Sequence, residues 1–166
     1  MDTRIKGLMD YLDASHSVFH AVEGLRKILE EAGYIRLQES SKWELVPGGK
    51  YYMTRGGASI MAFRIPEAAA KGFLMSASHA DRPTFKVKEN GELCGKYTRL
   101  AVERYGGMLM APWLDRPLSI AGRVLVETST CMETKLIDID RDLLLIPNVA
   151  IHMNRKASTA VPPRTR

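Results

Sequence analysis

A histidine and an aspartate separated by one residue are the side chains of this sequence whose types and spacing best suit chemistry. His79 and Asp81 follow the apolar run "GFLMSAS" and come just before Pro83. Side chains two positions apart in an extended chain point to the same face, so the imidazole and the carboxylate would be neighbours. A neutral imidazole is a good zinc ligand, and a carboxylate beside it can hold the ring in one tautomer. The pair therefore indicates a metal site in which Asp81 orients His79.

The same pair also has a plainer interpretation. A histidine at the end of a strand can form a hydrogen bond with a nearby carboxylate without any metal, and a short motif alone is a weak hypothesis. A catalytic zinc site takes at least three protein ligands, and this pair offers one imidazole. The local pattern by itself favours the plainer interpretation for His79.

The segments before the pair predict two helices followed by strands. Apolar residues recur at helical spacing over 3–14 and over 18–32, with Ser17 placed to cap the second helix and Gly33 placed to end it. Two or three strands joined by glycine turns are expected within 43–66. We expect residues 72–78 to be a strand buried on both faces, with His79 at its carboxyl end, where open α/β sheets bind ligands.

After Pro83 the pattern stays strand-like. The strand candidates are "TFKVK", "YTRLAVERY", "LSIAGRVLVET", "TKLIDID" and "LLLIPNVAIHM". A helix-rich start and a β-rich remainder predict two units that meet near Lys88: a partial α/β unit over 1–88 and a partial β-rich unit over 89–156. Residues 157–166 lose all periodicity, and we expect them to be a disordered basic tail.

The totals argue against several classes of protein. The net charge of +5 raises the question of nucleic acid, but basic and acidic residues alternate along most of the chain, and no motif of a nucleic-acid-binding domain occurs. No window approaches the roughly 20 apolar residues that span a bilayer, and the N-terminus lacks the apolar core of a signal peptide. Cys94 and Cys131 fit no metal-binding pattern. We therefore expect a cytoplasmic chain that binds neither nucleic acid nor a membrane.

Several long segments together resemble one protein family. These segments are "SHSVFHAVEGLRKILEEAGY", "SASHADRPTFKVKENGEL", "KYTRLAVERYGGMLMAPWLDRPLSIAGRV" and "DRDLLLIPNVAIHMNR". In this order they resemble the N-terminal part of the M18 aminopeptidases, the aspartyl aminopeptidase family. The resemblance covers roughly residues 1–156 and is far more specific than the His-x-Asp pair alone.

The resemblance implies a fold and an activity. The chain would be α/β, the N-terminal part of a zinc-exopeptidase α/β sandwich followed by part of a β-rich dimerisation domain. Family members are cytoplasmic or vacuolar peptidases with two Zn2+ ions per site. They remove N-terminal residues from peptides, acidic ones in the best-known members, and assemble into dodecamers. The implied function is therefore that of a zinc-dependent aminopeptidase and homo-oligomer acting on peptide substrates.

The resemblance also implies residue roles. His79 would bind one zinc ion, and Asp81 would act in catalysis by orienting its ring. His152, in "IPNVAIHMNR", would reach the active site of a neighbouring subunit and help to hold substrate; without the resemblance, we would interpret it as a strand histidine at a β interface. We assign no metal role to Asp115 in "WLDRP", which we expect to be a turn carboxylate paired with Arg116 or capping nearby amides.

Two departures from the family pattern affect these roles. Arg82 stands inside the zinc motif, where relatives usually carry a small residue, and its cation would repel metal or block the pocket unless it turned outward. The family's remaining metal ligands and its general base have no counterpart here, so we interpret the chain as truncated and expect no peptidase activity and no tight zinc site from it alone. The alternative function is a non-catalytic oligomerisation fragment that docks on a full-length relative.

Overall fold

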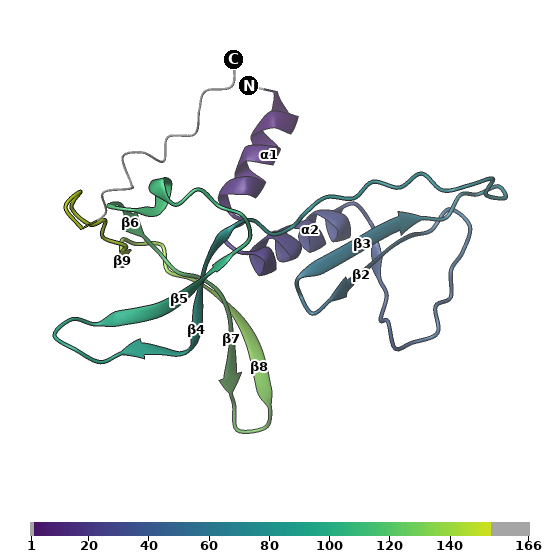
Figure 1. Ribbon diagram of the computed structural model, residues 1–166. Coiled ribbons are helices and arrows are strands. Elements are labelled where there is room, and N and C mark those ends of the chain that lie inside the picture. Colours follow the sequence, from purple (N-terminus) through teal and green to yellow (C-terminus); the bar gives the residue numbers. More distant parts are fainter. Residues whose placement is uncertain (1, 154–166) are drawn as a thin grey trace, which may run out of the picture.

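The computed structural model describes residues 2–153, which form a helical part and several β hairpins (Figure 1). The helices are α1 (Thr3–Asp13) and α2 (Val18–Glu31). The strands are β1 (Ile35–Arg36), β2 (Lys50–Arg55), β3 (Ser59–Arg64), β4 (Thr84–Leu93), β5 (Arg99–Tyr105), β6 (Pro117–Leu118), β7 (Ala121–Glu127), β8 (Met132–Asp138) and β9 (Leu144–Leu145). A short 3-10 turn at Ala111–Trp113 precedes β6.

Both predicted helices are confirmed, and local capping explains their ends. The Asp2 carboxylate accepts a hydrogen bond from the backbone N–H of Arg4 at 2.9 Å, which caps α1. The Ser17 hydroxyl accepts from the backbone N–H of His20 and caps α2. Gly33 follows α2 with a φ of +79°, the left-handed conformation that glycine adopts without a steric penalty.

Helix α2 packs on a three-stranded sheet and forms the core of the helical part. Strand β1 pairs parallel to β2, and β2 pairs antiparallel to β3. The middle strand β2 carries Tyr52, whose side chain is 0% exposed and whose hydroxyl donates to the Glu30 carboxylate of α2. Arg26 of α2 binds Glu30 in turn, so the buried phenol belongs to a charged network at the helix surface. The other buried apolar residues of this core are Ala21, Val22, Tyr51 and Met53.

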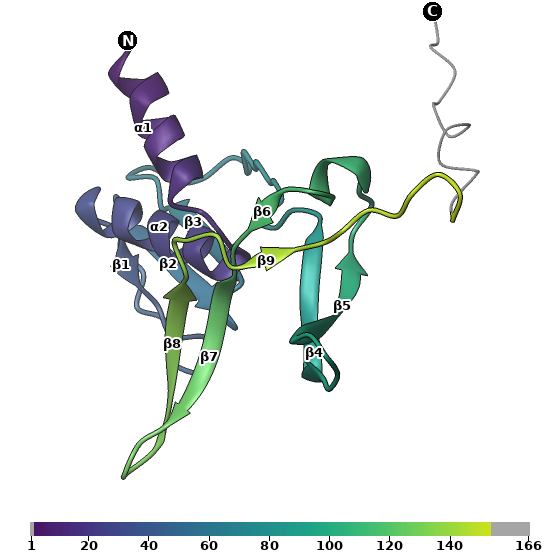
Figure 2. The ribbon, with the colours of Figure 1, turned by 90° about the vertical axis from the view of Figure 1, so that its left-hand side faces the viewer.

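The second part consists of separate two-stranded ribbons. Strand β4 pairs with β5, β7 with β8, and β6 with β9, each antiparallel. Figure 2 shows the β7–β8 hairpin beside the helical part and the β4–β5 hairpin next to it. The "ENGE" segment, which follows the strand candidate "TFKVK", lies within β4, where the register with β5 shifts and Asn90 has a φ of 51°. This position is a bulge, which bends the strand without ending it.

The two parts contact each other at the junction between α1 and α2. Arg123 of β7 donates to the backbone carbonyl of Gly56 at 2.6 Å, and its guanidinium lies 4.2 Å from the ring centroid of Phe19. The imidazole Nδ1 of His16 lies 2.6 Å from a carboxylate oxygen of Asp138 in β8. The unit boundary predicted at residue 88 falls inside β4 and stays a prediction.

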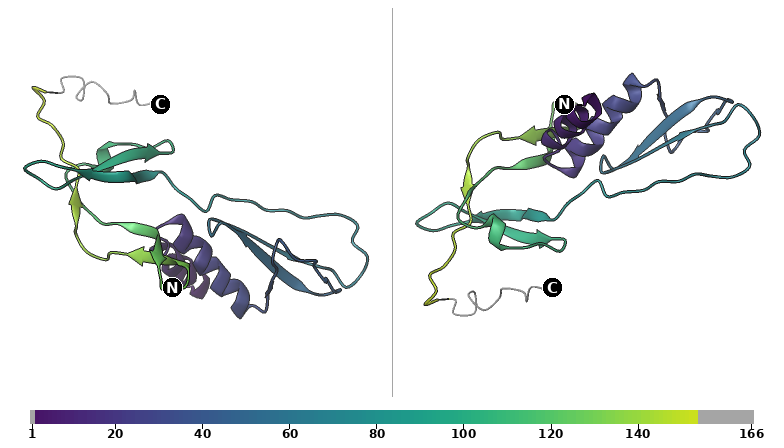
Figure 3. Two further views of the ribbon diagram at one scale, coloured as in Figure 1. Left: turned by 90° about the horizontal axis from the view of Figure 1, so that it is seen from below. Right: turned by 90° about the horizontal axis from the view of Figure 1, so that it is seen from above.

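The prediction of a buried strand at residues 72–78 is wrong for the described structure. This segment is an extended run without regular structure between β3 and β4 (Figure 3), and Phe73 is 93% exposed. Leu74 and Met75 are exposed as well. A strand needs hydrogen-bonding neighbours, and within residues 2–153 no strand pairs with this segment. The apolar pattern alone therefore did not make a strand here, because the pairing that would form and bury one is absent from the described residues.

The remaining predictions concern membrane-spanning segments, the two cysteines and the C-terminal tail. Within residues 2–153, no helix is long and apolar enough to cross a membrane. Cys94 and Cys131 are exposed free thiols. The predicted basic tail at 157–166 lies outside the described residues.

The burial of Tyr52 predicts how substitutions affect stability. Tyr52→Ala should lower the free energy of unfolding by about 3–5 kcal/mol, because it leaves a cavity where a large aromatic ring was packed. Tyr52→Phe should cost about 1–2 kcal/mol through loss of the hydrogen bond to Glu30. Tyr97, which is 79% exposed, offers the matched control, and Tyr97→Ala should change stability by less than about 0.5 kcal/mol. Urea unfolding followed by circular dichroism measures all three, and equal effects of Tyr52→Ala and Tyr97→Ala would contradict this core.

The α2 network predicts a loss of stability in acid. The Tyr52 hydroxyl and then Arg26 hold the pKa of Glu30 below its ordinary value of 4.5, and Arg26 lowers the pKa of Glu23 in the same way. A carboxylate with a lowered folded-state pKa stabilises the fold above its ordinary pKa, and this stabilisation disappears as the pH falls through the lowered value. The urea concentration at the midpoint of unfolding should therefore decrease as the pH is lowered below about 4.5. In Glu30→Gln this decrease should be less steep. Glu89→Gln, at an exposed position of β4, should keep the wild-type slope; a Glu30→Gln slope equal to wild type would refute the network's role.

Candidate metal-binding site

His79 and Asp81 are brought together as the sequence predicts. The imidazole Nδ1 of His79 lies 2.8 Å from Oδ1 of Asp81. An ionised carboxylate only accepts hydrogen bonds, so Nδ1 carries the proton and Nε2 keeps its lone pair when the ring is neutral. The His79 side chain is 92% exposed, whereas that of Asp81 is 31% exposed. The carboxylate thus fixes a ring whose other nitrogen is open for a ligand.

A tyrosine from β5 binds the other oxygen of the same carboxylate. The Tyr105 hydroxyl donates to Oδ2 of Asp81, so each carboxylate oxygen has its own donor. The hydrogen bond from Tyr105, and after it the one from His79, lowers the pKa of Asp81, which keeps this carboxylate ionised. The same contact raises the pKa of Tyr105 and keeps its phenol protonated as a donor. Asp81 therefore joins His79 to the β-rich part of the molecule.

Strand register explains why Tyr105 reaches Asp81. Tyr105 is the last residue of β5 and pairs with Thr84, the first residue of β4. Its side chain therefore lies beside the residues that immediately precede β4. Gly106 follows with a φ of +77°, and a Cβ at this position would lie 3.4 Å from the Cα of Pro83. The positive φ favours glycine here, and the backbone after β5 lies against Pro83 of the 79–83 segment.

Arg82 turns toward the helices and binds backbone there. Its guanidinium donates to the carbonyl oxygen of Ser15 at 2.6 Å and to that of His16 at 2.9 Å. Ser15 is buried, and its hydroxyl donates to the carbonyl of Tyr11 in α1. Of the two expectations for Arg82, a cation that blocks the site or one that turns away from it, the described contacts agree with the second. Arg82 connects the 79–83 segment to the junction between α1 and α2.

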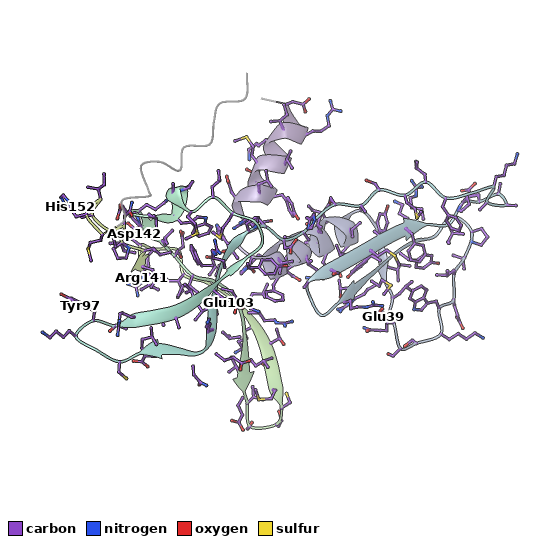
Figure 4. The ribbon with its side chains drawn as sticks, in the orientation of Figure 1. Glu39, Tyr97, Glu103, Arg141, Asp142 and His152 are labelled. Atoms are coloured by element: carbon purple, nitrogen blue, oxygen red, sulfur yellow. The ribbon has the colours of Figure 1, made fainter. Side chains whose placement is uncertain are left out.

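His152 lies in a different region of the described chain. It belongs to an exposed turn after β9, closed by a hydrogen bond from the Met153 N–H to the Ala150 carbonyl at 2.8 Å. Figure 4 shows it at the outer edge of the molecule, beyond Arg141 and Asp142. Its assigned role, contact with substrate in a neighbouring subunit, stays a prediction.

Asp115 is a turn carboxylate, as expected. It has a φ of 53°, and its Oδ1 accepts from the backbone N–H of Asn148 at 2.8 Å. The expected capping of an amide is confirmed, whereas within the described residues Arg116 donates to the carbonyl of Pro112 and forms no ion pair with Asp115. Asp115 thus connects the segment before β6 to the one that leads to His152.

The donor set fits one ligand of a zinc site and falls short of a complete one. His79 has the second nitrogen free and the first fixed by a carboxylate, as metal-bound histidines have. Within residues 2–153, no three histidine, cysteine or acidic side chains lie close enough to hold a metal together. The local sequence pattern pointed to His79 and Asp81, but it gave no sign of Tyr105 or of the carbonyls that Arg82 binds. Only the register of β4 with β5 could have revealed Tyr105, and no local pattern in the sequence fixes that register.

Comparison with known proteins identifies the family. The model of the family described as aminopeptidase I zinc metalloproteases (M18) matches residues 11–165. The chain belongs to the M18 family. This M18 chain is 46% identical over 155 residues to the probable M18 family aminopeptidase 2 of Pseudomonas putida, covering 92% of the chain and 36% of the relative. It is 42% identical over 160 residues to that of Clostridium acetobutylicum, with coverage of 93% and 37%.

Solved structures confirm the fold class. The M18 chain matches a chain of the complex of Ape4 and Nbr1 with a TM-score of 0.81 and 37% identity, over 93% of this chain and 31% of that one. It matches mApe1 of Chaetomium thermophilum with a TM-score of 0.80 and 36% identity, over 89% and 35%. It matches a chain of the mApe1 dodecamer of S. cerevisiae with a TM-score of 0.77 and 27% identity, over 90% of this chain and 36% of that one. The chain therefore spans about a third of the length of these proteins.

The contacts of Arg82 predict a measurable loosening when they are lost. In Arg82→Ala, amides at the junction between α1 and α2 should exchange hydrogen about tenfold faster, because hydrogen bonds from a charged donor contribute about 1.5 kcal/mol or more. Arg82→Lys should recover little, since an ammonium lacks the planar fork that binds two carbonyls at once. Native-state hydrogen exchange measures this effect. The exposed Arg141 supplies the control, and equal exchange in Arg82→Ala and Arg141→Ala would show that the contact has no such role.

Proposed function

We propose that this chain forms part of a zinc-dependent aminopeptidase, in which His79 is one zinc ligand and Asp81 the carboxylate that orients it. The observation that carries the proposal is the hydrogen bond of 2.8 Å between His79 Nδ1 and Asp81, on a ring that is otherwise exposed. It occurs within the segment matched by the model of a zinc metalloprotease family. The pair thus has the arrangement of a metal histidine with its supporting carboxylate.

The chemistry divides between the metal and the chain. Zinc, when bound, would polarise a scissile carbonyl and lower the pKa of a bound water, and we propose two ions per site in the complete enzyme. The residues of this chain hold and orient the ligand: Asp81 accepts a hydrogen bond from the Nδ1–H of His79, which directs Nε2 outward. Arg82 keeps its charge on the carbonyls of Ser15 and His16, away from the imidazole. The rest of the metal site would come from polypeptide beyond these residues.

We further propose that the substrates are peptides, from which N-terminal residues, acidic ones among them, are removed. His152 would contribute a substrate contact in a neighbouring subunit of a homo-oligomer. The exposed turn that carries His152 supports such a contact, and the S. cerevisiae relative forms a dodecamer. The proposed units stay 1–88 for the α/β part and 89–156 for the β-rich part, whose hairpins expose the apolar side chains of Leu125 and Met132 for association.

A non-catalytic association fragment is the second candidate. The exposed Phe73, Leu74 and Met75 favour it, because an extended apolar segment invites pairing with another polypeptide. Co-expression with the Pseudomonas putida relative tests it: co-purification that leaves the relative's activity unchanged would support association without catalysis.

Zinc binding distinguishes the two candidates in a chimaera. Replacing the matched region of the Pseudomonas putida relative by residues 2–153 should give an enzyme that binds zinc and hydrolyses aminoacyl p-nitroanilides. In this chimaera His79→Ala should lose activity by about 1000-fold together with part of its zinc, since a ligand is removed. His20→Ala is the control, because His20 bonds only to Ser17 among the described side chains. A His79→Ala chimaera with full zinc content and activity would refute the proposed role.

The chain by itself is expected to behave differently. Purified 1–166 should show no peptidase activity and no tight zinc site, because a single imidazole cannot replace the three protein ligands of a catalytic zinc ion. Isothermal titration with zinc measures this directly. Tight binding that disappears in His79→Ala would contradict the expectation and would place a complete site within this chain.

A further inference from the structure

Asp81 is the link between an exposed imidazole and a rigid strand. Its side chain is 31% exposed and that of His79 is 92% exposed, so packing restrains the pair only weakly. What restrains it is hydrogen bonding: Oδ1 faces His79 and Oδ2 accepts from Tyr105. A carboxylate held at one oxygen alone can turn about its Cβ–Cγ bond, whereas one held at both oxygens has a fixed plane.

Tyr105 is placed to fix that plane because its own backbone is held firmly. It pairs with Thr84 in the β4–β5 ladder, and the close approach of Gly106 to Pro83 continues the contact beyond the strand. Side chains on a paired strand are positioned more accurately than side chains on a loop. The 79–83 segment, by contrast, has no regular structure of its own. Strand β5 therefore holds Tyr105 in a fixed position, and the 79–83 segment carries the proposed ligand His79.

We propose that Tyr105 is a positioning residue for the metal site: its hydroxyl holds Asp81 so that His79 keeps its proton on Nδ1 and presents Nε2 to the metal. The proposal rests on the proposed function for its metal, but its effect on the ring does not need one. It also assigns a role in the metal site to the β-rich part, because Tyr105 belongs to β5 and His79 precedes β4. Loss of the hydroxyl would weaken the orientation without removing a ligand.

A structural role alone would have a different signature. If Tyr105 only tied the end of β5 to the 79–83 segment, removing its hydroxyl would loosen that contact but leave the proton on the same nitrogen of His79. The tautomer of the ring is therefore the property that separates a positioning role from a structural one. Tyr105→Phe keeps the aromatic ring in the ladder and removes only the donor.

The experiment reads the two ring nitrogens of His79 in the full chain labelled with 15N-histidine. Long-range 1H–15N correlation at about pH 8.5 reads which ring nitrogen of a neutral imidazole carries the proton. The His79 signals are assigned by their absence in His79→Gln. Wild type should show the Nδ1–H tautomer in excess, and Tyr105→Phe should lower the Nδ1–H to Nε2–H ratio by about fivefold, with Asp81→Ala abolishing the preference. Tyr97→Phe, at the exposed loop between β4 and β5, should match wild type.

A second arm measures zinc affinity in the chimaera with the Pseudomonas putida relative. There Tyr105→Phe should weaken zinc binding by about tenfold, the usual effect of losing a residue that supports a metal ligand, and Tyr97→Phe should not. This arm decides the question if the isolated Tyr105→Phe chain fails to fold. An unchanged tautomer ratio in a folded Tyr105→Phe chain, or unchanged zinc affinity in the chimaera, would overturn the positioning role. A wild-type chimaera that binds no zinc would instead refute the proposed function and leave the tautomer result standing.

Discussion

The carboxylate of Asp81 is the contact on which the arrangement of the candidate site depends. One oxygen meets His79 and the other meets Tyr105, so a single side chain joins a segment without regular structure to the end of a paired strand. The register of β4 with β5 makes this possible, because it places Tyr105 opposite the residue where β4 begins. Without that register, Asp81 would lose its donor from β5, and the imidazole would be oriented only by a carboxylate of its own exposed segment.

A second set of contacts holds the same region from the other side. At the junction between α1 and α2, the guanidinium of Arg82 donates to two backbone carbonyls. The guanidinium of Arg123 lies over the ring of Phe19, and the carboxylate of Asp138 contacts the imidazole of His16. Two of these contacts come from the β7–β8 hairpin and one from the 79–83 segment. The junction is thus where the helical part, the site segment and the β-rich part meet, although its own residues carry no chemistry.

The sequence predicted those elements whose signals are local. Ser17 and Gly33 mark the ends of α2 by their hydrogen-bonding and conformational preferences, and both are found in those roles. The failure at 72–78 has the opposite origin: an apolar run specifies a strand only where other strands pair with it. The contacts of Tyr105 and Arg82 were not predicted from the sequence for a related reason. Each acts on residues distant in sequence, through a strand register or a docking contact that a single sequence does not encode locally.

The exposed run and the exposed imidazole are consequences of one fact. Phe73, Leu74 and Met75 lie in the same extended segment as His79, and neither face of that segment is covered within the described residues. Burying such side chains stabilises a protein by about 1.5–3 kcal/mol each, so pairing of another polypeptide with the segment would be favoured by this burial. The same pairing would order the residues just before His79. Covering the segment would therefore also order the proposed metal ligand, whose segment Tyr105 and Arg82 hold at its other end.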